Sequence, residues 1–375
     1  MSRIHADPTI LTGVEAFARE VLAPMAAEID ETGRFAGVHL PKLAEMGLMG
    51  LNLAAEDGGL GVDAWTIFEA TAIVAGACGS TASMITAHWL ATDSIVHGGS
   101  PEQRARWLPR AAAGEILGAF GLTEPGAGSN PVDMTTRAVR EGEGWRLHGV
   151  KHFISNAAHA DFIVVYAKTD PTAGARGISA FVVEPSAGGV TIGGPERTMG
   201  LRGGHVFEVV LDCLVPDENR LGAPGSGFKT ALKTLDAGRL DIAACAVGVA
   251  EAAFAAAIAW AKSRIVEGRP IAEFQGLQWK IADMGLDLAA SRGLADAATA
   301  KRAKGERFST EAAMAKLHAS EMAGRVTDAA LQIHGGYGYT RDFPLERWAR
   351  DVRILRIYEG SSEIQRNILA RTLLA

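Results

Sequence analysis

The sequence predicts an α+β fold with an N-terminal helical domain, a middle antiparallel β-barrel or sandwich domain, and a C-terminal four-helix bundle. Helical periodicity runs to about residue 118, short β-branched strands separated by turn residues follow to about residue 222, and long helical patterns then continue to the C-terminus. We therefore place the three domains at residues 1–118, 119–223 and 224–375. A chain of 375 residues is long enough to bury a large core in two or three layers.

The N-terminal part has the spacing and the end signals of several helices. Phe17, Val21 and Met25 recur every four residues, as on one face of a helix. Ser100 and Pro101 are the residue types favoured at the N-cap and at the first position of a helix. These helices need no role beyond packing.

The middle part contains short strands with no helical pattern between them. Residues 145–151 alternate apolar and polar side chains, and residues 162–166, 178–183 and 206–211 are β-branched and aromatic runs closed by turn residues. This favours an antiparallel barrel or sandwich over a Rossmann sheet. No GxGxxG pattern follows these runs, so a dinucleotide bound by that fingerprint is not expected.

Long helices are predicted again from Gly227 onward. Residues 240–261 are almost all small or apolar, but Asp241 and Glu251 lie among them and alanine contributes little transfer energy. We expect a buried bundle helix here, and no membrane span. Further along, mostly small residues recur at spacings of three and four, which lets helices approach closely; they are Ala313, Leu317, Ser320, Gly324, Thr327 and Leu331.

Composition excludes several function classes. A net charge of −6 without a basic run argues against nucleic acid as a partner. Cys78, Cys213 and Cys245 are far apart and have no histidine at ligand spacing, so we expect neither a disulfide framework nor a metal site. Residues 1–10 lack the apolar core of a signal peptide, and we expect a cytoplasmic protein.

The strongest catalytic candidate is Glu359, which lies between two predicted helices near the C-terminus. Gly360 follows it and permits a tight break, while Ser361 or Ser362 can cap the next helix. The Glu359 carboxylate could then enter a pocket. Taken alone, the same pattern is also that of an ordinary helix–helix turn with a solvated glutamate.

Three further motifs help to decide whether Glu359 is a catalytic residue or a solvated turn residue. Residues 120–130 leave a strand and enter a loop in which glycines would let the main chain approach a flat ligand or a phosphate. Residues 149–157 place a hydroxyl, Ser155, two residues after an aromatic ring, Phe153. Residues 332–339 end a helix in a run of glycines. Each motif could be purely structural by itself.

Together and in this order, these segments closely resemble the acyl-CoA dehydrogenase family, and residues 270–275 and 282–284 add to the match. The resemblance implies an FAD-dependent enzyme that oxidises the Cα–Cβ bond of an acyl-CoA to a trans-2-enoyl-CoA. It implies that Glu359 abstracts the α-proton while the β-hydride goes to flavin N5. Burial beneath the flavin should raise the pKa of Glu359.

The resemblance also assigns binding roles by position. Around the flavin it implies Phe120, Leu122, Thr123, Gly128, Ser129, Phe153 and Ser155, with Ser361 and Glu363 near the dinucleotide. For the FAD of a neighbouring subunit it implies Arg264, Gln275, Gln332, Gly335 and Gly336, and hence a homotetramer built as a dimer of dimers. For the acyl-CoA it implies Ser129, Asp236, Arg239 and Gly360. Electron-transfer flavoprotein is the expected electron acceptor.

Departures from the family pattern concern three positions. Asn130 replaces the usual aspartate, and Glu267 replaces a phenylalanine that normally packs near the cofactor of the other subunit. Gly238 stands where the isovaleryl and long-chain branches carry their base, which leaves Glu359 for that role. The Gly238–Arg239 pair is similar to that of the short-chain and branched short-chain members.

Two alternatives share this fold plan. One is a flavin oxidase or monooxygenase, in which the glutamate is commonly replaced. The other is a non-catalytic FAD-binding subunit that uses the fold for assembly. Retention of Glu359 and Gly360 argues against the first, and the intact set of site residues argues against the second.

Overall fold

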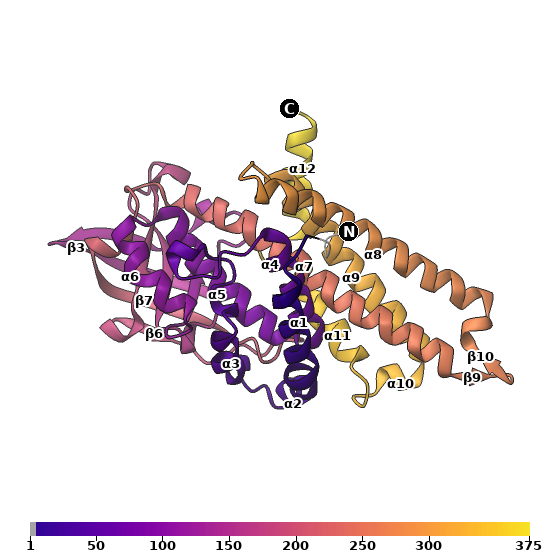
Figure 1. Ribbon diagram of the computed structural model, residues 1–375. Helices are drawn as coiled ribbons and strands as arrows, with labels where there is room; N and C mark the ends of the chain where they lie inside the picture. The colour runs from indigo at the N-terminus through magenta and orange to yellow at the C-terminus, as the bar shows by residue number, and fades with distance from the viewer. Residues whose placement is uncertain (1–4) are drawn as a thin grey trace.

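A computed structural model describes residues 5–375, and its three parts follow the predicted order (Figure 1). The N-terminal helices are α1 (Pro8–Phe17), α2 (Ala23–Thr32), α3 (Leu40–Glu45), α4 (Ala64–Ala77), α5 (Gly79–Gly98) and α6 (Pro101–Ala112). A π-helical turn, Ala18–Leu22, joins α1 to α2. Ser100 caps α6 in a capping box with Gln103, as its side chain predicted.

The middle part is a β domain, as predicted. Its strands are β1 (Gly118–Gly121), β2 (Arg137–Glu141), β3 (Gly144–Ser155), β4 (Phe162–Lys168), β5 (Ile178–Val183), β6 (Val190–Ile192), β7 (Val206–Pro216) and β8 (Arg220–Leu221). They form one eight-stranded sheet in the order β6-β7-β3-β2-β4-β5-β8, with β1 also paired to β4.

The expectation of a purely antiparallel domain was wrong in one respect. β1 pairs with β4 in parallel, and β2 meets the end of β4 in parallel as well. The chain reaches β4 from β1 only after the loop of residues 122–136 and the β2–β3 hairpin, and a connection of that length can return a strand in the same direction.

Strand β4 divides two hydrophobic cores. Phe162, Val164 and Tyr166 pack in one core with side chains of α5 and α6, whereas Ile163 and Val165 point into the other core, which lies within the sheet domain. β4 is therefore apolar on both faces. This packing holds one face of the sheet against the N-terminal helices, where β1 leads into the loop of residues 122–136.

The C-terminal part consists of α7 (Gly227–Ser263), α8 (Gln275–Ala303) and α9 (Ser309–His334), followed by α10 (Gly336–Tyr339), α11 (Leu345–Asp351) and α12 (Ser362–Leu373). The long helices run side by side, α12 packs on α9, and the hairpin β9–β10 (Ile265–Val266 and Arg269–Pro270) joins α7 to α8 (Figure 1).

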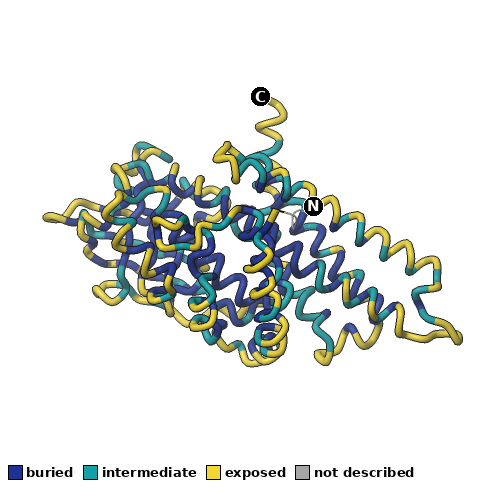
Figure 2. The backbone as a smooth tube through the Cα atoms, viewed as in Figure 1, coloured by how far each residue is buried: buried dark blue, intermediate teal, exposed yellow. Residues whose placement is uncertain are grey.

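Helix α7 is the central helix of the molecule. It packs against α4, α5, α8 and α9. By length and composition it is the single helix within residues 5–375 that could cross a membrane, but 61% of its most apolar window is buried inside the protein. The prediction of a buried bundle helix is confirmed (Figure 2).

Candidate active site

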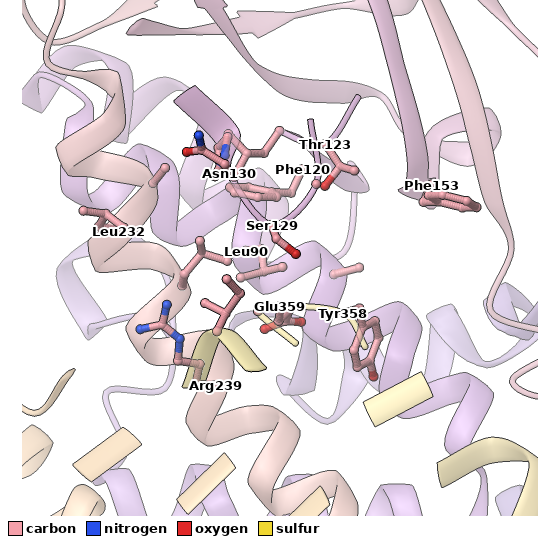
Figure 3. Close-up of a pocket in the computed structure, with 18 of the residues that line it drawn as sticks. Leu90, Phe120, Thr123, Ser129, Asn130, Phe153, Leu232, Arg239, Tyr358 and Glu359 are labelled. Carbon is pink, nitrogen blue, oxygen red and sulfur yellow. The ribbon is translucent and has the colours of Figure 1, made fainter. Parts of the chain in front are cut away.

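A cavity of about 540 Å³ lies where the β domain meets the helices of both other parts (Figure 3). β1 and β3, the loop after β1, helices α5, α7 and α12, and the loop before α12 all contribute side chains to its wall. Ten of the sequence-predicted site residues line it: Phe120, Leu122, Thr123, Gly128, Ser129, Phe153, Ser155, Arg239, Glu359 and Gly360. Residues from all three sequence regions thus meet at one place.

Glu359 occupies a strained break between the 3₁₀ turn Val352–Arg356 and helix α12. Its φ is +52°, and that of Gly360 is +88°. Left-handed backbone costs a non-glycine residue about 1–2 kcal/mol, so the surroundings must hold it in place. Of the two predicted capping candidates, Ser361 caps α12 by accepting a hydrogen bond from the Ile364 N–H at 3.4 Å, and Ser362 is the first residue of the helix.

The Glu359 carboxylate points into the cavity, and the Ser129 hydroxyl points into the same cavity (Figure 3). Its Oε2 atom is enclosed and has no hydrogen-bond partner among the described residues. Burial raises the pKa of Glu359 to about 7, against the opposing influence of Lys316 and Arg239. A carboxylate with such a pKa can accept a proton efficiently near neutral pH.

The loop after β1 is organised by a buried ion pair. Nζ of Lys151 on β3 lies 2.8 Å from Oε1 of Glu124 and also donates to the Leu122 carbonyl at 3.1 Å. Burial opposes ionisation of Glu124, but Lys151 and hydrogen bonds from Thr135 and Thr136 hold its pKa below the ordinary value. The pair joins the two sequence motifs and fixes Leu122 and Thr123 at the cavity wall.

Phe153 reaches the cavity because strand β3 is irregular there. The pairing of β3 with β7 shifts between Lys151 and Ile154, and Phe153 has a φ of +58°. Bulges of this kind re-aim side chains next to active sites. The ring is 59% exposed, stacks on His152 at 4.0 Å between centroids, and lies apart from the other labelled residues of Figure 3.

Arg239 on α7 is buried, with its side chain 6% exposed. It forms an ion pair with Asp236, one turn earlier, which in turn accepts a hydrogen bond from the Ser309 hydroxyl. Burial lowers the pKa of Arg239, although Asp236 and Glu359 act in the opposite direction. Asp236 itself is outside the cavity wall, so of the predicted substrate contacts Ser129, Arg239 and Gly360 come together here.

The residues predicted to contact a neighbouring subunit lie elsewhere. Arg264, Gly335 and Gly336 line a second, open hollow together with Trp260 and Tyr337. This hollow is at the β9–β10 and α10 end of the C-terminal helices, away from the β domain (Figure 1). Gln275 and Gln332 are exposed at the start of α8 and near the end of α9. Ser361 and Glu363, which were predicted near the dinucleotide, are the N-cap and the second residue of α12 and lie outside the cavity wall.

Several residues of the cavity wall were missed by the sequence reasoning. Single helix faces supply most of them, at spacings of three and four: Ser83, Thr86, Ala87 and Leu90 from α5, Phe228, Ala231, Leu232 and Leu235 from α7, and Ile364, Asn367, Ile368 and Arg371 from α12. These spacings are visible in the sequence, but they equally describe core-facing positions. Lys316, which contacts the Glu359 loop from α9, had no sequence signal.

Models of three consecutive protein domains match almost the whole chain. They are described as the N-terminal, middle and C-terminal domains of acyl-CoA dehydrogenase, and they match residues 7–115, 119–213 and 225–374.

The chain belongs to the acyl-CoA dehydrogenase family.

Individual acyl-CoA dehydrogenases and related proteins agree with this. The short-chain specific acyl-CoA dehydrogenase of Clostridium acetobutylicum is 42% identical over 359 residues, which cover 95% of each chain. The acryloyl-CoA reductase (NADH) of Anaerotignum propionicum is 42% identical over 96% of this chain and 92% of its own. The structure of butyryl-CoA dehydrogenase from Megasphaera elsdenii superimposes with a TM-score of 0.95 at 37% identity, covering 98% and 97% of the two chains.

Acyl-CoA dehydrogenases are FAD-dependent oxidoreductases, and the residues of this chain fit that cofactor. A β-carbon built on Gly128 would meet no atom within 4 Å, so the loop leaves room for a ligand beside its backbone. The exposed ring of Phe153 offers a flat apolar surface, and Thr123, Ser129 and Ser155 supply hydroxyl groups in the same cavity. Together they suit the flat, polar-edged flavin ring.

Proposed function

We propose that this chain dehydrogenates a short or branched short-chain acyl-CoA to the trans-2-enoyl-CoA, with Glu359 as the base that takes the α-proton. The observation that carries the proposal is the Glu359 carboxylate, which faces the cavity without a hydrogen-bond partner among the described residues and has a pKa raised to about 7. The Cα–H bond breaks with its proton passing to Glu359, the Cβ–H bond breaks with loss of hydride, and the Cα–Cβ double bond forms. FAD, when bound, supplies the acceptor for that hydride.

The chain's own residues set up this proton transfer. The apolar wall supplied by Leu90, Leu232 and Leu235 excludes water from the acyl chain and keeps the carboxylate poorly solvated. A positioned general base of this kind contributes about 10²–10⁴-fold to the rate. The flavin would be held by Phe120, Leu122, Thr123, Gly128, Ser129, Phe153 and Ser155. The acyl-CoA would be held by Ser129, Arg239 and Gly360, with Asp236 acting through its ion pair with Arg239.

The electron acceptor that we propose is electron-transfer flavoprotein. A chain in the solved structure described as electron transferring flavoprotein of Acidaminococcus fermentans superimposes with a TM-score of 0.95 and is 40% identical to this chain. The proposal is tested by turnover with purified electron-transfer flavoprotein and the best acyl-CoA. Reduction of the flavoprotein is the expected result.

We further propose a homotetramer in the cytoplasm. Arg264, Gly335 and Gly336 form a surface hollow that is not part of the Glu359 cavity, so a neighbouring subunit's FAD could use it, with Gln275 and Gln332 nearby in sequence. The outer face of α8 exposes Trp279 and Leu286, which are 62% and 69% exposed and favour a covered interface (Figure 2). Light scattering should give four times the monomer mass.

The reducing compartment is supported by the cysteines. Cys78, Cys213 and Cys245 are all buried and unpaired in the described structure.

We also propose that the chain divides into three domains, at residues 1–118, 119–223 and 224–375. Limited proteolysis near residues 118 and 224 is its test.

The decisive experiment is an anaerobic panel of acyl-CoAs. The purified protein should be yellow, and butyryl-CoA or isobutyryl-CoA should bleach the flavin absorbance. If no acyl-CoA in the panel bleached it, the dehydrogenase proposal would fail. Acryloyl-CoA added to the reduced protein tests the reverse direction, which the name of the Anaerotignum propionicum relative describes for that protein.

A flavin oxidase remains the alternative because of one solved structure. The prolyl acyl carrier protein oxidase AnaB superimposes with a TM-score of 0.94 at 30% identity. Rapid re-oxidation of the bleached protein by air, with release of peroxide, would favour that function. Slow re-oxidation by air and fast re-oxidation by electron-transfer flavoprotein would favour the dehydrogenase.

A further inference from the structure

Lys316 on α9 is a buried lysine close to the loop that carries Glu359. Its side chain is 0% exposed, and its Nζ donates hydrogen bonds to the carbonyl oxygens of Tyr358 at 3.1 Å and Gly360 at 2.7 Å. These two carbonyls belong to the residues immediately before and after Glu359. One ammonium group therefore holds the main chain on both sides of the proposed base.

A second side chain contacts the same segment from the other direction. Gln365, on α12 and 0% exposed, donates its Nε2 hydrogens to the Gly360 carbonyl at 2.8 Å and to the Glu359 carbonyl at 3.4 Å. The carbonyls of Tyr358, Glu359 and Gly360 all accept from these two side chains. They are the groups that would turn if Glu359 left its left-handed conformation.

The charge of Lys316 also acts on the cavity. Burial lowers the pKa of Lys316 to about 8, while Glu359 acts to raise it and Arg239 to lower it. The charged groups around Lys316 are Glu359 and Glu363 from the C-terminal segment, Arg239 from α7, and Glu321 from α9 itself. Near neutral pH a protonated Lys316 favours the ionised form of Glu359.

We propose that Lys316 is the positioning residue of the Glu359 loop: its two hydrogen bonds fix the backbone that aims the carboxylate, and its charge favours the carboxylate form. Gln365 also fixes this backbone, but it carries no charge. The inference rests on the proposed function, since it assigns Lys316 a part in preparing the base of that reaction. It is a separate claim, because Lys316 itself lies outside the cavity wall.

Three variants separate hydrogen bonding from charge in the FAD-loaded enzyme. Lys316→Met removes both, Lys316→Gln keeps a donor without the charge, and Gln365→Leu removes a donor without changing the charge. We expect Lys316→Met to reduce its flavin at least ~10-fold more slowly and to raise the apparent pKa of kcat/KM by about one unit. Lys316→Gln should keep the raised apparent pKa but regain much of the rate at high pH, where Glu359 is ionised.

Gln365→Leu should slow flavin reduction without moving the apparent pKa. A merely structural lysine would change stability and leave that pKa in place. The matched control is Lys301→Met on α8, which removes a partly exposed ion pair with Glu311 away from the cavity wall and should leave the rate and the pH profile as in the unmutated protein.

A readout independent of activity is hydrogen–deuterium exchange of residues 357–365. We expect faster exchange there in Lys316→Met and in Gln365→Leu than in the unmutated protein. If the unmutated protein is not bleached by any acyl-CoA, the proposed function fails. The role of Lys316 is refuted if the unmutated protein is bleached and both Lys316→Gln and Lys316→Met show the same rate, apparent pKa and hydrogen–deuterium exchange as the unmutated protein. Should Lys316→Met not fold, Lys316→Gln and Gln365→Leu decide between the same outcomes.

Discussion

Gly238 on α7 lies directly against Glu359, and a β-carbon built at Gly238 would overlap Oε2 of the glutamate. The same β-carbon would lie 2.8 Å from a δ-carbon of Leu90 on α5, so it would be crowded by that side chain as well. The sequence singled out Gly238 because it cannot supply a second base. In the structure its missing side chain has a further consequence, since it leaves the space that the Glu359 carboxylate occupies.

Gly238→Ala should therefore displace the carboxylate and slow flavin reduction by about 100-fold, the cost of a misplacement of about 1 Å. FAD should still bind, because Gly238 is outside the cavity wall. Stopped-flow reduction by the best acyl-CoA measures the effect. The control is Gly13→Ala on α1, whose β-carbon would approach nothing closer than the Met46 side chain at 3.9 Å. Reduction of Gly238→Ala at the unmutated rate would show that the overlap is relieved without cost.

Glu359→Gln should keep its yellow colour and its affinity for acyl-CoA but lose about 10²–10⁴-fold in the rate of flavin reduction. The amide has nearly the same shape as the carboxylate and cannot accept the α-proton. Anaerobic stopped-flow absorbance gives the rate, and equilibrium titration gives the affinity. A rate close to that of the unmutated protein would place the base on another residue.

The rate should depend on pH through the pKa of Glu359, which burial raises to about 7. Only the ionised carboxylate can take a proton, so kcat/KM should rise as the pH increases through about 7 and level off above it. Below that pH the rate should fall about tenfold for each unit. A profile that is flat from about pH 5 to 9 would contradict a titrating base in the free enzyme.

Lys151→Met should destabilise the protein by about 3–5 kcal/mol, because it leaves the buried Glu124 carboxylate without its ion-pair partner. Chemical denaturation of the FAD-loaded protein measures the change. Arg146→Met, on the same strand but in exposed ion pairs with Glu141 and Asp212, should leave the unfolding midpoint nearly unchanged. Equal effects of the two variants would mean that burial of the Lys151–Glu124 pair does not add to the free energy of unfolding.

Phe153→Ala should weaken FAD binding by about 0.5–1.5 kcal/mol, a few-fold to about tenfold in the dissociation constant, through loss of ring stacking. Fluorescence titration of the apoprotein with FAD is the measurement. Val139→Ala on β2 removes a similarly exposed apolar side chain, 61% exposed, outside the cavity wall and is the control. An unchanged dissociation constant for Phe153→Ala would remove Phe153 from the flavin site.

Local sequence signals were enough to predict the order of helices, sheet and helices, the Ser100 cap, and strand β5, whose predicted and observed bounds coincide. They narrowed the cap of α12 to Ser361 or Ser362, and the structure shows Ser361. These features depend on local chemistry: side-chain periodicity, capping hydroxyls and turn residues. The motifs around Phe120, Phe153 and Glu359 also identified much of the cavity wall, because they resemble those of a family whose members share one fold.

Three features could not be predicted without the folded structure: the parallel pairing of β1 with β4, the space that Gly238 leaves for Glu359, and the contacts of Lys316 with the Glu359 loop. Each of these joins segments that are more than forty residues apart. No spacing rule links such positions in one sequence, because they are brought together by packing and hydrogen bonds that form only as the chain folds. The sequence thus indicated Glu359 as the candidate base, while the packing of α7 and α9 decides how its carboxylate is held.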